Sequence, residues 1–225
     1  MPITPVRNQE SPLKTEDLID ALASDLRPCS AVGLDCRLAL AAGGAGLAAL
    51  AGVIVWLKMR PDLAEAVTGA VFWGKAAYTM ALATCGFWIL TRLGRPGVSV
   101  RAPLLVLTGV LSLAAAVAVS ELLRAAPEHR YSLLMGGSAS VCPGYILALT
   151  AMAAPFVVWG ARQFAPTRPR AAGAAVGLVT ASVAATLYGL HCPERAATFV
   201  IVWYSLGILL ATLVGGLLGG RLLRW

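Results

Sequence analysis

The sequence predicts an all-α integral membrane protein with six transmembrane helices, both termini cytoplasmic, and a short cytoplasmic N-terminal tail. Of the 225 residues, 58% are hydrophobic and only 13% are charged, and the mean hydropathy is +0.76. An average soluble domain has about 25% charged residues. The apolar residues form blocks of about 20, the length that crosses roughly 30 Å of hydrocarbon. These blocks are apolar on every face, which excludes alternating barrel strands and favours helices that satisfy their own backbone groups in lipid.

Polar and apolar stretches divide the chain into three parts. Residues 1–37 form a polar tail without a signal peptide, residues 38–220 form the predicted transmembrane domain, and residues 221–225 form a cytoplasmic C-terminus. The six predicted spans are residues 38–57, 71–90, 102–123, 138–160, 171–190 and 196–220. Glycines spaced four apart in the last two spans, such as Gly173 with Gly177 and Gly215 with Gly219, predict close helix packing within the chain.

The basic residues predict the orientation of these spans. Twelve lie in the tail, the second and fourth loops and the C-terminus, whereas five lie in the opposite set of loops. Because basic loops stay in the cytoplasm, both termini are expected inside, in a multi-pass membrane protein. The basic residues do not gather in one stripe, so we expect contact with membrane lipid and no direct contact with nucleic acid.

The tail contains one amphipathic segment, residues 15–26. Its apolar side chains share one face of a helical wheel and its acidic side chains give the segment a charge of −4. The apolar and acidic residues are Leu18, Ile19, Leu22 and Leu26, and Glu16, Asp17, Asp20 and Asp25. A helix this acidic suits an anionic membrane surface poorly. It either docks in the groove of a partner protein or packs under its own bundle.

The five cysteines differ in their expected surroundings. Cys29 and Cys36 are expected to be ordinary cytoplasmic thiols, and Cys85 a small apolar side chain within a helix. Cys142 and Cys192 are predicted at the outer interface, and each precedes a proline. Three interpretations of this pair remain open: a structural disulfide, a redox or thiophilic-metal sensor, and two cysteines that never meet.

Helix geometry and a histidine bear on the sensor interpretation. Pro143 suits the first position of a helix, which makes Cys142 the expected cap, where the helix dipole favours a thiolate. His191 adjoins Cys192 and could activate it or bind a metal. His129, Glu128 and Glu194 are also expected to face outward and could complete a metal site, but their spacing matches no motif, so they are expected to be solvated loop residues.

The sequence contains no motif for catalysis or for a cofactor. A Gly-rich phosphate loop, HExxH, GxSxG and C-x-x-C are all absent, so we expect neither an enzyme nor a cofactor. Lys75 and Glu121 are predicted at similar depths in the second and third spans, which suggests an ion pair between them. Two other classes remain as alternatives: a quinone-linked thiol-disulfide membrane oxidoreductase and a small membrane transporter.

Several motifs, taken in order, resemble the NrsF family of bacterial membrane proteins, negative regulators of an extracytoplasmic-function sigma factor of the sigma-F type. The matching features run along nearly the whole chain. They are residues 14–19, Leu22, Asp25, residues 60–63, Phe72, Trp73, Lys75, Cys142, and residues 190–194, 203–207 and 220–225. Tyr204 departs from the family pattern, in which histidine is expected.

This resemblance implies an anti-sigma factor that holds its sigma factor at the membrane and releases it under heavy-metal or oxidative stress. It implies that Cys142 and Cys192 receive the signal, a heavy-metal ion or an oxidant. It also favours the partner-binding interpretation of the acidic tail segment, because sigma factors bind DNA through basic surfaces that a −4 helix complements.

Overall fold

The computed structural model of the chain describes residues 15–24, 31–95, 97–164 and 166–223. The chain divides into two units, residues 1–33 and residues 34–225. The first unit contains the helix α1 (Thr15–Ser24) and the first three residues of the next helix. The second unit is a bundle of helices, and the part of the chain that the structure describes contains no strand.

Six long helical segments make up the bundle. The first combines α2 with the π-helical segment η1, and the last combines α9, the π-helical segment η2 and α10. The elements are α2 (Ala31–Gly52), η1 (Val53–Leu57), α3 (Leu63–Ala66), α4 (Ala70–Leu93), α5 (Arg101–Arg124), α6 (Pro127–Met135), α7 (Cys142–Arg162), α8 (Pro169–Tyr188), α9 (Ala197–Phe199), η2 (Val200–Tyr204) and α10 (Ser205–Leu222). Both π-helical segments contain the same run, Val-Ile-Val-Trp.

The sequence located these segments closely. Each predicted span overlaps one long helical segment, and the largest differences are at two helix starts. The first segment begins at Ala31, before the predicted residue 38, and α7 begins at Cys142, after the predicted residue 138. The expectation that Cys142 caps this helix is wrong by one residue: Val141 is the cap and Cys142 is the first helical residue. The short helices α3 and α6 were not predicted.

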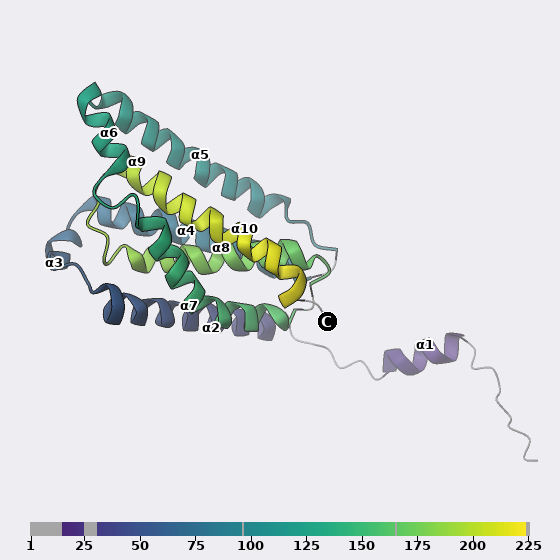
Figure 1. Cartoon of the computed structure of the whole chain (residues 1–225). Helices are drawn as coiled ribbons and strands as arrows, with labels where there is room; N and C mark the ends of the chain where they lie inside the picture. The colour runs from purple at the N-terminus through teal and green to yellow at the C-terminus, as the bar shows by residue number, and fades with distance from the viewer. Residues whose placement is uncertain (1–14, 25–30, 96, 165, 224–225) are drawn as a thin grey trace, which may run out of the picture. The chain divides into compact units, whose positions relative to one another are not determined.

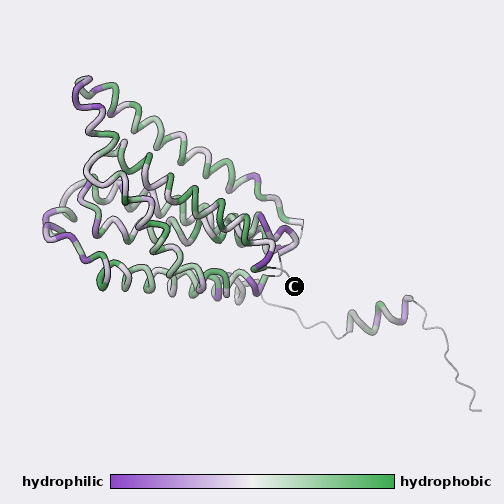
Figure 2. The backbone as a smooth tube through the Cα atoms, viewed as in Figure 1, coloured by the Kyte–Doolittle hydropathy of each residue, from purple (hydrophilic) through white to green (hydrophobic). Residues whose placement is uncertain are grey.

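Five of the long helices are apolar and long enough to cross a membrane: Asp35–Leu57, Arg101–Arg124, Cys142–Arg162, Pro169–Tyr188 and Ala197–Leu222. The remaining one, α4, has 24 residues and is also long enough. It is not one of these five, and it carries Lys75, Arg92 and several Thr and Gly residues. Figure 2 shows hydrophobic residues along the helices of the bundle and hydrophilic ones gathered near their ends.

The long helices run side by side (Figure 1). Helix α8 is the central one: about two thirds of its apolar stretch (67%) is buried, and it packs on α4, α7 and α10. Helix α5 lies along one edge and is only 17% buried. The α3 region, α6 and the α8–α9 connection lie at one end of the bundle, and the α4–α5 and α7–α8 connections lie at the other.

Glycines allow α8 and α10 to approach each other closely. A Cβ atom added to Gly173 would collide with the backbone of Gly215 and Gly219, and one added to Gly177 would collide with the backbone of Ala211. The small residues therefore face each other within one chain, as predicted. Gly216 and Gly220, which have the same spacing, have only ordinary contacts.

Candidate functional site

The structure brings Cys142 and Cys192 into one buried cluster. Cys142 is the first residue of α7, and Cys192 lies in the α8–α9 connection, residues 189–196, which we call the Cys192 loop. Both side chains are fully buried, both thiols are free, and each interacts electrostatically with the other. The two cysteines therefore share one buried environment. Of the other described cysteines, Cys36 is exposed and Cys85 is buried, and both are free; Cys29 lies outside the described residues.

Two tyrosines enclose the two thiols. The Tyr188 hydroxyl faces the Cys142 thiol and interacts with it. The Tyr204 hydroxyl faces the Cys192 thiol, yet its buried oxygen has no well-aligned hydrogen-bond partner within the described residues. The rings of Tyr188 and Tyr204 are 5.5 Å apart between centroids. In the sequence, Tyr204 stands out only as a departure from the family pattern, and Tyr188 does not stand out.

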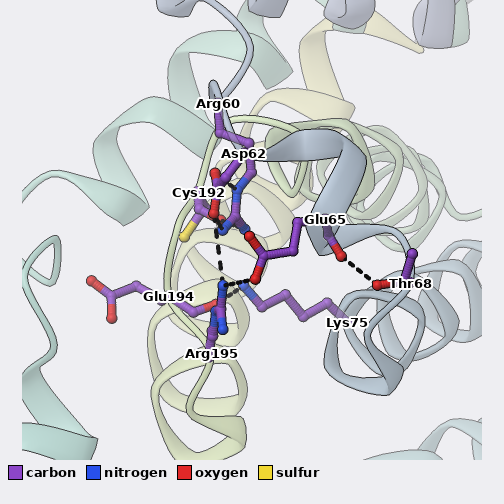
Figure 3. A network of polar contacts seen from close by, with 8 residues as sticks. All are labelled: Arg60, Asp62, Glu65, Thr68, Lys75, Cys192, Glu194 and Arg195. Carbon is purple, nitrogen blue, oxygen red and sulfur yellow. Dashed lines mark hydrogen bonds and ion pairs between the residues drawn. The ribbon is translucent and has the colours of Figure 1, made fainter.

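Arg60 fastens the Cys192 loop to the segment between η1 and α3. Its backbone N–H donates to the Leu190 carbonyl (3.1 Å), and its Nη1 donates to the Cys192 carbonyl (3.3 Å). Its Nε and Nη2 donate to the two carboxylate oxygens of Asp62, at 2.7 and 2.5 Å. This paired geometry (Figure 3) fixes the plane of the guanidinium. Arg60 is therefore a positioning residue for the cysteine.

The Arg60–Asp62 pair also changes the titration of both groups. The hydrogen bonds from Arg60 lower the pKa of the Asp62 carboxyl to about 2. The same carboxylate raises the pKa of the Arg60 guanidinium above its usual value. The pair therefore stays ionised at neutral pH. The residues 60–63 were part of the family resemblance, but their role in holding the Cys192 loop could not be predicted.

Glu194 connects the Cys192 loop to the segment before Cys142. Its Oε1 accepts hydrogen bonds from the Gly137 N–H (2.7 Å) and the Ser138 hydroxyl (2.9 Å). The Ser138 carbonyl in turn accepts from the Cys142 N–H at 2.9 Å. A chain of contacts thus joins the two cysteines. Glu194, two residues after Cys192, accepts from Ser138, and the Ser138 carbonyl accepts from Cys142. The expectation that Glu194 is a solvated loop residue is wrong, because its carboxylate is hydrogen-bonded to Gly137 and Ser138 of another segment.

The suggested Lys75–Glu121 ion pair is wrong. The Lys75 ammonium is buried and donates instead to the backbone carbonyl of Glu194. The Glu121 carboxylate accepts hydrogen bonds from Ala197 N–H (3.1 Å), Thr198 N–H (2.6 Å) and the Thr198 hydroxyl (2.6 Å). It therefore satisfies the first backbone donors of α9. A similar predicted depth did not imply contact, because Lys75 bonds to the Cys192 loop and Glu121 bonds to α9.

His191 is the one expected metal-binding side chain that adjoins the cluster. Its Nδ1 lies 2.8 Å from the Lys58 carbonyl. Because a carbonyl only accepts, Nδ1 is the donor in this contact. The ring centroid is 5.7 Å from that of Tyr188. Across the described residues, no three His, Cys, Asp or Glu side chains are grouped closely enough to hold a metal ion. A metal at this site would use the two thiols rather than a preformed cage.

The tail segment forms a helix over Thr15–Ser24, with Glu16 and Asp17 in its first turn, where the dipole favours acids. The side chains of Glu16, Asp17 and Asp20 are exposed, and that of Ile19 is 57% exposed. Leu18 and Leu22 lie within the helix, but their side chains are not among those that the structure describes. Asp25 and Leu26, the last two predicted contact residues, lie outside the described residues.

Comparisons with known proteins cover nearly the whole chain. A family model described as "NrsF: Negative regulator of sigma F" matches residues 22–225. The "Anti-sigma-F factor NrsF" of Caulobacter vibrioides (strain NA1000 / CB15N) is 43% identical over 214 residues, 95% of this chain and 100% of the relative. The "Probable anti-sigma-F factor NrsF" of Azospira oryzae (strain ATCC BAA-33 / DSM 13638 / PS) is 38% identical over the same shares. No solved structure matches the chain.

Proposed function

The chain belongs to the NrsF family, and on this premise we propose that it is a membrane-bound anti-sigma factor. In this proposal six spans cross the bacterial inner membrane with both termini in the cytoplasm. The tail holds an extracytoplasmic-function sigma factor inactive, and heavy-metal or oxidative stress acting at Cys142 and Cys192 releases it. The observation that carries the sensing step is that both thiols are free and buried in one cluster.

The chemistry of the signal uses both thiols. Capture of a soft cation releases two protons as the thiols become thiolate ligands. Formation of a disulfide transfers two electrons to an external oxidant and releases two protons. Either reaction needs access to side chains that are fully buried in the resting protein. The Cys192 loop must therefore open first, which breaks its contacts with Arg60, Lys75 and Lys58.

Those contacts supply a route from the thiols towards the tail. Lys58 and Arg60 directly follow the continuous helical segment α2–η1, which leads back along the chain towards the tail. Glu194 adds a connection to the start of α7. A reaction that moves the Cys192 loop therefore acts on the ends of two spans. The signal shifts the balance between sigma-bound and sigma-free states by its differential affinity for them.

The tail helix offers two features that suit a sigma factor. An exposed apolar residue such as Ile19 can enter a groove of the partner. The exposed Glu16, Asp17 and Asp20 can pair with a basic rim. The alternative interpretation is that this helix packs under its own bundle. In that case a change of Ile19 would not reduce binding of the sigma factor.

The tail assignment is tested by co-precipitation of the sigma factor with the full-length chain from membranes. Ile19→Glu places a charge on the apolar face and is expected to reduce recovery of the sigma factor about tenfold or more, comparable with the loss of one anchor residue. Ser24→Glu lies on the opposite side of the helix and serves as the matched control. Equal recovery with both variants contradicts the assignment.

The sensing assignment is tested with a reporter gene driven by the sigma factor. Cys142→Ser and Cys192→Ser, singly and together, are expected to abolish induction by cadmium or by an oxidant. Cys36→Ser, a change at an exposed cysteine, is expected to leave induction intact. If the serine variants respond like the parent while remaining in the membrane, the two cysteines have only a structural role.

A further inference from the structure

Two adjoining cavities meet at Lys75. The first is a groove of about 410 Å³ between α4, α5 and the α9–η2 segment, and the second is a polar pocket of about 200 Å³ between α3, the start of α4 and the Cys192 loop. Val71 and Lys75 line both. A groove of this volume falls in the usual range for small-molecule sites. We propose that the two cavities together bind one anionic phospholipid, with the phosphate at Lys75 and an acyl chain in the groove.

The groove is suited to a hydrocarbon chain. Apart from Lys75 and Tyr78, its walls are formed by Ala, Val, Leu, Ile and Gly residues. The Tyr78 hydroxyl is hydrogen-bonded to the Ser205 hydroxyl at 2.6 Å, so it is not left without a partner in the groove. The α5 residues of the groove, Val110 to Val117, lie in the middle of a helix that is apolar enough to cross a membrane. The groove thus lies at the depth of acyl chains, and this step rests on the proposed membrane location alone.

The polar pocket is suited to a negatively charged headgroup. Arg60 is neutralised by Asp62, as Figure 3 shows, but Lys75 has a main-chain carbonyl as its acceptor. The Glu194 carboxylate points away from Lys75 towards Gly137 and Ser138. Within the described residues, no carboxylate forms an ion pair with this buried ammonium, which can donate two more hydrogen bonds.

Arg195 adds a second, weakly engaged cation. Its guanidinium is 3.7 Å from Asp62 and 3.9 Å from Glu65, too far for hydrogen bonds. Glu65 is the opposing charge in the pocket, but it is largely exposed and faces Arg195. A phosphate between Lys75 and Arg195 would supply hydrogen-bond acceptors and negative charge to both side chains. The position of Lys75 towards the bundle end, with the groove running inwards from it, matches the orientation of a lipid within one leaflet.

The test measures lipid bound to the purified full-length protein by native mass spectrometry. The protein is offered dioleoylphosphatidylglycerol and dioleoylphosphatidylcholine in equal amounts, so that only the headgroup differs. We expect the anionic lipid to be retained preferentially. Lys75→Gln keeps a donor for the Glu194 carbonyl but removes the charge, and is expected to lower this preference about tenfold. Lys75→Arg is expected to retain it.

The groove is tested separately with two glycines. A Cβ added to Gly74 or to Gly109 meets no atom within 4 Å, so both tolerate a larger residue, but only Gly74 lines the groove. Gly74→Leu is expected to reduce retention of the anionic lipid several-fold, whereas Gly109→Leu is expected to leave it unchanged. Equal retention of the two lipids, equal effects of the two leucines, or displacement of the lipid by excess inorganic phosphate would each overturn the proposal. Sigma binding is not part of any readout, so this test is independent of the proposed function.

Discussion

Removal of the Glu194 carboxylate should release the Cys192 loop. In Glu194→Ala, two hydrogen bonds to a charged acceptor are lost, at 2.7 Å from Gly137 and 2.9 Å from Ser138. Such bonds contribute about 1.5–3 kcal/mol each. Gly137 is exposed and Ser138 is half-buried, so we take about 2 kcal/mol for the two together. This amount changes the opening equilibrium of the loop about 30-fold.

The assay is the rate at which N-ethylmaleimide labels Cys192, read at its own peptide by mass spectrometry. Because the thiol is fully buried, labelling requires opening, and its rate follows the open population. We expect a rise of about 30-fold for Glu194→Ala. Glu194→Gln keeps an acceptor oxygen without the charge and should give a smaller rise.

Glu128→Ala, a change at an exposed glutamate of α6, controls for loss of charge near the same end of the bundle. Unchanged labelling in Glu194→Ala would refute the reasoning. So would an equal increase in the Glu128 variant, because the effect would then not depend on the link to Gly137 and Ser138.

Three further predictions concern stability, measured as the thermal denaturation of the detergent-solubilised protein. Gly173→Ala should destabilise the bundle by about 1–3 kcal/mol through collision with α10, whereas Gly216→Ala, which meets only ordinary contacts, should not. Because the folded pKa of Asp62 is depressed to about 2, its stabilising effect relative to Asp62→Asn should be constant from pH 5 to 8 and lost as the pH falls from about 4 towards 2; the opposite trend would contradict the pairing. Tyr204→Phe removes an unpartnered buried hydroxyl and should leave stability equal or higher by about 1 kcal/mol, while Tyr78→Phe breaks a hydrogen bond and should lower it by a similar amount.

Local patterns were sufficient to predict the long helices and the tail helix. A run of apolar residues such as 102–123 must form a helix in lipid, whatever its neighbours are, and α5 spans Arg101–Arg124. The tail helix likewise followed from its own periodicity and its acidic first turn. The facing of Gly173 and Gly215 was also predictable in kind, since small residues at a spacing of four are the usual means of close approach between membrane helices.

The contacts of the candidate site were less predictable. Cys142 and Cys192 were identified from their position at predicted span ends, but Arg60, Glu194 and Tyr188 were not assigned their roles. The predicted partner of Lys75 was wrong. Its acceptor is a main-chain carbonyl, and because every residue has one, the sequence does not indicate which carbonyl it is. Tyr204 attracted notice only as a departure from a family pattern.

The sequence by itself determined what each segment is: which residues are helical, which are apolar enough for a membrane, and which side chains carry reactive groups. These properties depend on residues within a few positions of one another. The tertiary structure decided which reactive groups meet. Arg60 and Cys192 are 132 residues apart in the chain. They meet because packing of α8 against its neighbours places the two loops that carry them at the same end of the bundle.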